Sequence, residues 1–269
     1  RDKLVTGVQT CALPISLLRP AEISLLASCG KAQVTVQRRP VVAIVSTGDE
    51  LVELGTAPGP AQLLNSNSVT LAAAVREAGA VPRMLGIARD NRLAHLDKLR
   101  QGLAADVLIT SAGVSAGDRD LVRVTLEELG VKFVFWKVAI KPGKPTAFGL
   151  FEGRPIFCLP GNPVASQITF DQFVRPALLR MQGRQQVLRP LIRATLQDSI
   201  KPASRMRFLR VRLQRQDGAW LASSAGNQET GILRTSLLSE GLALVTAETA
   251  FEPGDQLMVR LLGEPLEEI

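Results

Sequence analysis

The chain has 269 residues, of which 46% are hydrophobic and 21% are charged. This composition is typical of a soluble globular protein with one large domain or two ordinary ones. No apolar stretch reaches the ~18 residues that cross a bilayer, and the first residues lack the basic-then-apolar order of a signal peptide. We therefore expect a cytoplasmic protein without membrane segments.

The net charge of +7 is unevenly distributed. Residues 1–40 contain six basic and two acidic side chains, residues 41–186 contain sixteen and thirteen, and residues 187–269 contain ten of each. Nucleic-acid binding proteins concentrate basic charge on one element and add aromatic side chains that stack on bases. Aromatic residues make up only 4% of this chain and tyrosine is absent. The charge therefore favours a small anionic substrate over a nucleic acid.

The chain contains three widely spaced cysteines and a single histidine, His95. This set lacks the paired spacing of a zinc site, and an odd number of cysteines argues against a disulfide framework, so a reducing compartment is indicated. Cys158 lies in an apolar run and is expected in the core. His95 lies in a polar stretch with a helical pattern, and we expect its side chain to be exposed to solvent.

In chain order, residues 1–16 show no periodicity and are interpreted as a foreign or unstructured leader. Residues 17–39 are interpreted as the remnant of a preceding domain and a connector. From residue 40 to residue 185, short apolar runs alternate with helical stretches, which is typical of a parallel α/β domain. The predicted strands are 41–45, 81–87, 106–110, 132–138 and 155–159, and the predicted helices are 67–79, 93–102, 121–129 and 164–181.

The pattern changes in residues 186–269, which contain short alternating segments and turn residues such as Pro253 and Gly254. Residues 205–213 alternate between charged and apolar side chains with one interruption at Leu209, which predicts a strand with a bulge. We interpret this region as a small β-barrel or sandwich. Its arginines are expected on a solvated strand face, with Arg210 as a candidate exception.

Four unusual loops follow the predicted strands, and the carboxyl ends of parallel strands open onto one crevice where ligands bind. The loop after the third strand consists of small residues, which let backbone N–H groups approach an anion. Three lysines follow the fourth strand, and carboxylates occur in the other loops. Lysines together with hard oxygen ligands indicate a magnesium–phosphate substrate.

These loops carry the resemblance to a known family. The chain is similar to the molybdopterin molybdenumtransferases, which include the E domain of gephyrin, in four motifs that keep the family's order and spacing. The motifs are Thr47–Leu51 (TGDEL), Thr110–Ser115 (TSAGVS), Lys141–Pro145 (KPGKP) and Leu159–Val164 (LPGNPV). The resemblance covers about residues 17–269.

The resemblance implies an α/β molybdopterin-binding domain followed by a small all-β barrel, and a homodimer of the full-length protein. It implies a transferase that acts on adenylylated molybdopterin. A divalent cation, expected to be Mg²⁺, assists release of the adenylyl group as AMP, and molybdate is inserted into the dithiolene to give molybdenum cofactor.

Motif positions carry the family's functional residues onto this chain. The implied catalytic carboxylates are Glu50, Asp90 and Asp120, of which Glu50 and Asp120 are the implied metal ligands. The implied substrate-binding residues are Ser111, Gly113, Ser115, Lys137, Lys141, Lys144, Gly161, Asn162, Arg210 and Thr235.

Three departures from the family pattern matter. Ala112 replaces the commoner glycine of the anion loop, and Ala165 stands where many members have serine, with Ser166 next. The family's two N-terminal domains are almost wholly absent from this sequence, so we expect a chain that folds and binds anions but turns over poorly.

Other readings remain. A molybdopterin adenylyltransferase shares the α/β domain but would not need the barrel. A non-enzymatic scaffold resembling gephyrin would need a hydrophobic peptide groove. A DNA-binding protein has only the net charge in its favour. The residues do not distinguish molybdate from tungstate.

Overall fold

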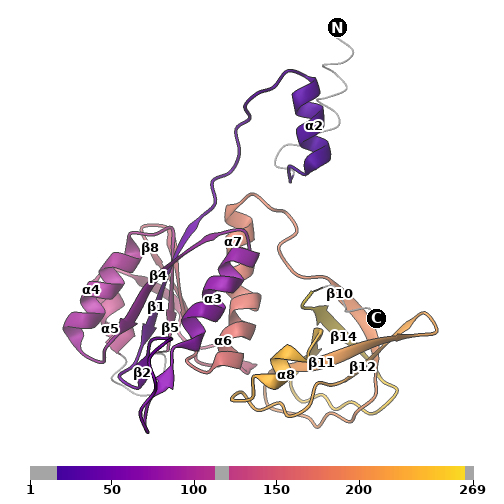
Figure 1. Cartoon of the computed structure of the whole chain (residues 1–269). Coiled ribbons are helices and arrows are strands. Elements are labelled where there is room, and N and C mark those ends of the chain that lie inside the picture. Colours follow the sequence, from indigo (N-terminus) through magenta and orange to yellow (C-terminus); the bar gives the residue numbers. More distant parts are fainter. Residues whose placement is uncertain (1–16, 113–120, 264–269) are drawn as a thin grey trace.

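Two β-sheets form the framework of the protein, each in its own domain (Figure 1). The computed structural model describes residues 17–112 and 121–263. The first sheet has the strand order β4-β1-β5-β9-β8-β6. Its strands are β1 (Val41–Thr47), β4 (Val81–Ala88), β5 (Val107–Ser111), β6 (Lys132–Phe135), β8 (Ala147–Phe151) and β9 (Arg154–Leu159).

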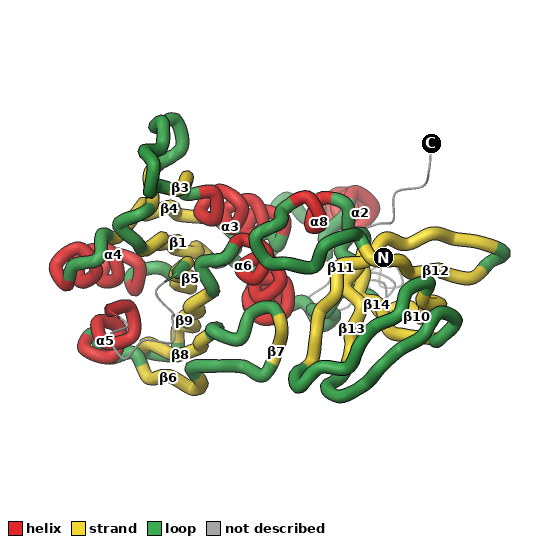
Figure 2. The backbone as a smooth tube through the Cα atoms, turned by 90° about the horizontal axis from the view of Figure 1, so that it is seen from below, coloured by secondary structure: helices red, strands yellow, loops and turns green. Residues whose placement is uncertain are grey.

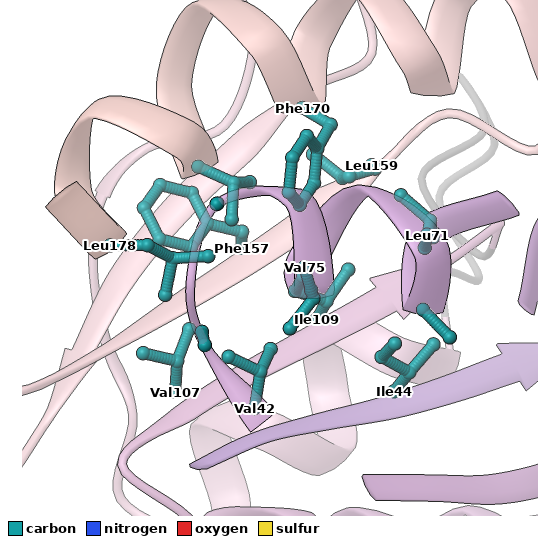
Figure 3. Close-up of a cluster of buried hydrophobic side chains, with 14 residues drawn as sticks. Val42, Ile44, Leu71, Val75, Val107, Ile109, Phe157, Leu159, Phe170 and Leu178 are labelled. Carbon is teal, nitrogen blue, oxygen red and sulfur yellow. The ribbon is translucent and has the colours of Figure 1, made fainter. Parts of the chain in front are cut away.

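Helices cover both faces of this sheet, which confirms the predicted α/β fold. Val42 and Ile44 of β1 pack in one core cluster, whereas Ala43 and Val45 pack in the other. A strand buried on both faces reads as a continuous apolar run, as β1 does. Figure 3 shows the first cluster. The helices are α3 (Ser66–Glu77), α4 (Arg92–Leu103), α5 (Leu121–Glu128), α6 (Pro163–Thr169) and α7 (Arg175–Met181).

One strand of the sheet, β8, was not predicted. β8 runs antiparallel to both β9 and β6, and the sequence pattern did not reveal it. Its centre is Gly149, a residue that weakens strand patterns but is required here, because a Cβ would lie 2.9 Å from Val131 Cγ1. A turn with positive φ at Glu152 and Gly153 links β8 to β9.

The predicted helix 164–181 is interrupted by a π-helical segment, η1 (Phe170–Val174), between α6 and α7. The predicted strand 132–138 ends earlier, at Phe135. Apolar periodicity locates such elements but does not reveal a local change in helical pitch. The element order otherwise follows the prediction.

The expectation for His95 was also wrong, because its side chain is buried, at 1% exposure. His95, Leu99, Gly102 and Leu103 are the buried residues of α4. Their spacing of four, seven and eight residues places them on one helix face against the sheet. The polar composition of the segment concealed this narrow face.

The second sheet closes on itself as a five-stranded barrel, which confirms the barrel prediction. The closing order is β11-β12-β10-β14-β13, with β13 pairing back to β11. Its core includes Val211, Leu213 and Val259. The strands are β10 (Leu191–Leu196), β11 (Met206–Gln216), β12 (Ala219–Ser224), β13 (Gly241–Val245) and β14 (Gln256–Leu261).

Strand β11 contains no bulge, contrary to the expectation at Leu209. Its two ladders run in regular register and meet at Val211. Leu209 and Val211 point into the barrel core, whereas Phe208 packs outside it against Val164 and Ile168 of α6. Both faces of the strand are therefore apolar here, because the α/β domain covers the outer one.

Two further contacts join the domains. The two-residue strand β7 (Ile140–Lys141) leaves the α/β domain and pairs in parallel with β11. In the connector, the Arg189 guanidinium donates to Asp171 of η1, to Glu77 of α3 and to the Leu262 carbonyl oxygen. The boundary predicted at residues 185–186 stays a prediction.

Before β1, the helix α2 (Pro20–Ser28) has no buried residue, and residues 31–39 are exposed. Figure 1 shows this segment standing away from both sheets. Among the described residues, no helix combines the length and apolar character that a membrane crossing requires.

Truncation of Phe208 should weaken the contact between the domains. Phe208 is 6% exposed and packs against α6, so Phe208→Ala should lower the free energy of unfolding by about 3–5 kcal/mol. Leu237→Ala, at a residue that is 84% exposed, is the control and should change it by less than about 0.5 kcal/mol. Denaturant unfolding measures both; equal effects would contradict the packing role.

Candidate functional site

The parallel strands bring four loops to one edge of the first sheet. β1, β4, β5 and β9 are consecutive neighbours and run in the same direction. The loops after Thr47, Ala88, Ser111 and Leu159 therefore emerge side by side, as expected for a ligand crevice. Figure 2 looks at the protein from this side.

Two asparagines at the start of α3 connect these loops. The Asn67 amide donates to Ser111 Oγ (2.9 Å) and to the Gly161 carbonyl oxygen (2.8 Å). Ser46 Oγ donates to Asn65 Oδ1 (2.8 Å), and Asn65 is buried. Sequence reasoning identified Ser111 and Gly161 but missed both asparagines. Their position directly before and within the first turn of a predicted helix was an available signal.

Carboxylates of two loops meet at this edge. The backbone N–H of Asp90 donates to Asp49 Oδ1 (3.0 Å), and that of Asp49 donates to Asp90 Oδ2 (3.3 Å). Glu50 is exposed, and its side chain folds back over Gly48, where a Cβ would lie 2.2 Å from Glu50 Oε2. The structure thus brings Asp90 and the Asp49–Glu50 loop to the same edge.

Gly113, Ser115 and Asp120 lie outside the described residues. Within residues 17–112 and 121–263, no group of three His, Cys, Asp or Glu side chains could hold a metal ion by itself. The roles of the predicted carboxylates stay predictions.

The anion loop begins in a strained conformation. Ala112 has a φ of 74°, in the left-handed region that disfavours every side chain with a Cβ. A Cβ on Gly161 would lie 2.9 Å from the Ala112 Cβ. The two loops approach so closely that a second Cβ at this contact would require a local shift. The left-handed φ makes alanine at position 112 conformationally unfavourable.

Asn162 follows Gly161 and precedes α6. Its Oδ1 atom is buried and has no hydrogen-bond partner among the described residues, and the same holds for Ser166 Oγ. Ala165 is buried. Within the described residues, the Ser166 hydroxyl therefore forms no hydrogen bond that could replace one from a serine at position 165.

The three predicted lysines do not lie together. Lys137 and Lys144 are exposed at two ends of a loop that is held by a bond from Val138 N–H to the Lys144 carbonyl oxygen (3.0 Å). Lys141 lies further out, on β7, where it pairs with Arg207 of the barrel. This loop therefore links the sheet edge with the second domain.

The barrel holds a cavity of about 690 Å³ beside β7. Four cationic side chains line it, together with two acidic ones. The cations are Lys141, Lys201, Arg207 and Arg210, and the acids are Asp198 and Glu229. The volume lies within the range of small-molecule sites.

Arg210 is the unusual member of this lining, because it is 2% exposed and has no acidic partner among the described residues. Its guanidinium donates to Gln228 Oε1 and to the carbonyl oxygens of Asn227 and Glu229 at 3.2–3.4 Å. Its second terminal nitrogen, Nη1, is buried without a partner. Burial lowers the pKa of Arg210, but arginine remains protonated in proteins. A buried positive charge without a counterion favours an anionic ligand.

Thr235 is not brought to this cavity. Its hydroxyl donates to the Ile232 carbonyl oxygen (2.9 Å), and its side chain is buried near the short helix α8 (Arg234–Leu237). Thr230, which sequence reasoning missed, lines the cavity with Arg210. In the sequence, its position two residues after Gln228 in a polar segment did not indicate that it would line a cavity.

An α/β domain with four loops gathered at its strand ends, joined to a barrel with a cavity lined by cationic side chains, defines a two-domain protein. Residues 43–180 match the family described as the probable molybdopterin binding domain, and residues 193–262 match the MoeA C-terminal region (domain IV). The chain belongs to the family of the molybdopterin binding domain, and its C-terminal part matches the MoeA C-terminal region.

Relatives named molybdopterin molybdenumtransferase match this chain over much of its length. The chain is 36% identical over 250 residues to a molybdopterin molybdenumtransferase of Nostoc, covering 90% of this chain and 57% of the relative. It is 41% identical over 175 residues to that of Haemophilus influenzae, covering 64% and 43%. The crystal structure of a molybdopterin biosynthesis MoeA protein from Pyrococcus horikosii is similar, with a TM-score of 0.80 and 29% identity, covering 92% and 60%. The chain thus spans less than two thirds of each relative's length.

The contact between Ala112 and Gly161 can be tested with a double-mutant cycle. Ala112→Gly should raise the free energy of unfolding by about 1 kcal/mol, because it relieves the left-handed strain. Gly161→Ala should lower it by about 1–3 kcal/mol through overpacking. In the Ala112→Gly background the cost of Gly161→Ala should shrink, since the opposing Cβ is gone. Additive effects would contradict the contact.

His95 should make stability depend on pH. Burial is the largest influence and lowers the pKa of His95 below its ordinary value of 6.5. The unfolded chain therefore takes up a proton before the folded chain does, so stability present above pH 6.5 is lost as the pH falls. His95→Leu should lose less stability between pH 8 and pH 5 than the unaltered chain, as measured by urea unfolding. Parallel pH profiles would contradict the assignment.

Proposed function

We propose that this protein inserts molybdate into adenylylated molybdopterin, with release of AMP, to form molybdenum cofactor. Relatives that match this chain at 36% and 41% identity bear the name molybdopterin molybdenumtransferase. The closed barrel supports this reaction over molybdopterin adenylylation, which needs no second domain. The buried and uncompensated charge of Arg210 is the observation that carries the proposal.

The barrel cavity receives molybdate in this proposal. A tetrahedral dianion would supply the missing counterion of Arg210 and accept a hydrogen bond from its free Nη1. Lys141 reaches the same cavity from the loop that begins at the sheet edge. Lys137 and Lys144 lie at the other end of that loop and are suited to phosphate oxygens of the pterin substrate.

The sheet edge receives the phosphate part of adenylylated molybdopterin. Small residues let the substrate approach the backbone near Ser111 and Gly161, and the adjacent Asn162 has a buried Oδ1 without a partner among the described residues. We assign Asp90 to orienting the water that attacks the phosphoanhydride. The water oxygen bonds to phosphorus, AMP leaves, and a carboxylate accepts the released proton.

A divalent cation fits the donor chemistry of this edge. Mg²⁺ in phosphate sites is held by one or two carboxylates, with substrate oxygens and water completing its shell. Glu50 is the described carboxylate that we assign to it, and Asp120 is the second. The cation would neutralise phosphate charge. A cytoplasmic homodimer completes the proposal, and the unburied apolar side chains of α2 support the homodimer.

Removal of the buried charge should weaken molybdate binding. Arg210→Ala should weaken the affinity for molybdate about ten- to hundredfold, because a charge-assisted hydrogen bond contributes about 1.5–3 kcal/mol. Arg212→Ala is the matched control, since Arg212 lies two residues further along β11 and is exposed. Isothermal titration with sodium molybdate measures both. Equal affinity in all three proteins would refute the assignment of the barrel cavity.

Lys141→Ala tests the bridging loop in the same titration. Loss of this exposed lysine should weaken molybdate binding while the fold survives, because surface substitutions cost little stability. Lys132→Ala on β6 is the control. If Lys141→Ala binds molybdate as well as the control does, this lysine is merely solvated.

A further inference from the structure

His95 is a buried polar side chain near the sheet edge that the proposed function leaves without a role. It is the only histidine of the chain. Its side chain is 1% exposed, and neither Nδ1 nor Nε2 has a hydrogen-bond partner among the described residues. An imidazole buried in this way costs free energy that burial of leucine at the same place would not cost.

A partner lies just out of reach. His95 Nε2 is 3.8 Å from Asp90 Oδ1, beyond the 2.7–3.2 Å of an N–H···O bond. Asp90 and Asp49 are the acidic groups that act on the imidazole, and no basic group does so among the described residues. Because burial lowers its pKa, the imidazole is neutral at pH 7 and has one N–H to donate.

The Asp90 carboxylate has the freedom to close this distance. Its side chain is 49% exposed, and its hydrogen bond from the Asp49 N–H is long, at 3.3 Å. A rotation that moves Oδ1 by about 1 Å would bring it into hydrogen-bond range. Hydrogen bonds at such sites are often long without a ligand and tighten when substrate binds.

We propose that His95 is a positioning residue that donates its Nε2–H to the Asp90 carboxylate and orients it toward substrate. His95 itself lies behind Asp90 on the buried face of α4 and touches no reacting atom. A donor on the inner side of the carboxylate fixes its plane and leaves the outer lone pairs free. This inference rests on the proposed function of Asp90.

The single histidine permits a direct test that needs no turnover. In a two-dimensional ¹H–¹⁵N spectrum of the imidazole of the full chain, all signals belong to His95. We expect the Nε2–H tautomer at pH 7.5. Asp90→Asn should shift the Nε2 resonance, whereas Asp97→Asn, at an exposed carboxylate of the same helix that bonds to Gln101, should not. An Nδ1–H tautomer, or a spectrum unchanged by Asp90→Asn, would overturn the contact.

A kinetic test addresses the positioning role. His95→Leu keeps an apolar side chain in the buried site but removes the donor, and should lower kcat for molybdate-dependent AMP release about ten- to hundredfold with little change in KM. His95→Gln places an amide donor near the position of Nε2 and should restore part of this loss. An unchanged kcat in His95→Leu, or no rescue by His95→Gln, would overturn the role.

The two tests separate this inference from the proposed function. If the unaltered chain releases no AMP, the proposed turnover fails, and the spectrum still decides whether His95 and Asp90 interact. If AMP is released but the spectrum is insensitive to Asp90→Asn, the function stands and the inference falls.

Discussion

Strand β7 contributes only two residues to the barrel sheet, yet its pairing with β11 determines where a ligand can meet both domains. The pairing places Lys141 beside Arg207, and β11 carries Arg210 three residues further along the chain. On the outer face of β11, Phe208 packs against α6, the helix that follows the last strand end of the crevice. The same short stretch of barrel thus supports the cationic cavity and attaches it to the α/β domain.

The two domains carry opposite charges at their candidate sites. At the sheet edge, carboxylates are exposed and bond to backbone N–H groups of the neighbouring loop, which suits a site that shares a cation with phosphate oxygens. In the barrel, the guanidinium of Arg210 is buried and bonds only to neutral acceptors among the described residues. An anion that enters the cavity therefore gains from a charge already removed from water, and no acidic side chain has to be displaced.

His95 adds a constraint behind the crevice. Its burial follows from the face of α4 that packs on the sheet, but apolar packing alone would be better satisfied by leucine. The strained Ala112 and the close approach of Gly161 show a similar pattern on the other side of the crevice. Local conformations and buried groups that are unfavourable by themselves cluster at this edge, as is common where a structure is shaped for a ligand.

The sequence by itself determined the fold class and most of the crevice. Strand β1 is apolar on both faces, so its run predicted a buried parallel strand, and the polar loops after such strands had to share one edge. Only the tertiary structure decided which side chains of the second domain take part. The alternation of charged and apolar residues in β11 breaks at Leu209 because α6 covers Phe208 on the outer face, and no local pattern reveals that contact. Thr235 and Thr230 are equally polar in sequence, yet the barrel turns only Thr230 to the cavity. The burial of His95 likewise depended on how α4 packs against the sheet, on the face that also carries Leu99, Gly102 and Leu103. Neighbouring residues in the sequence specify each helix or strand. The surfaces against which it packs are specified by residues distant in the chain.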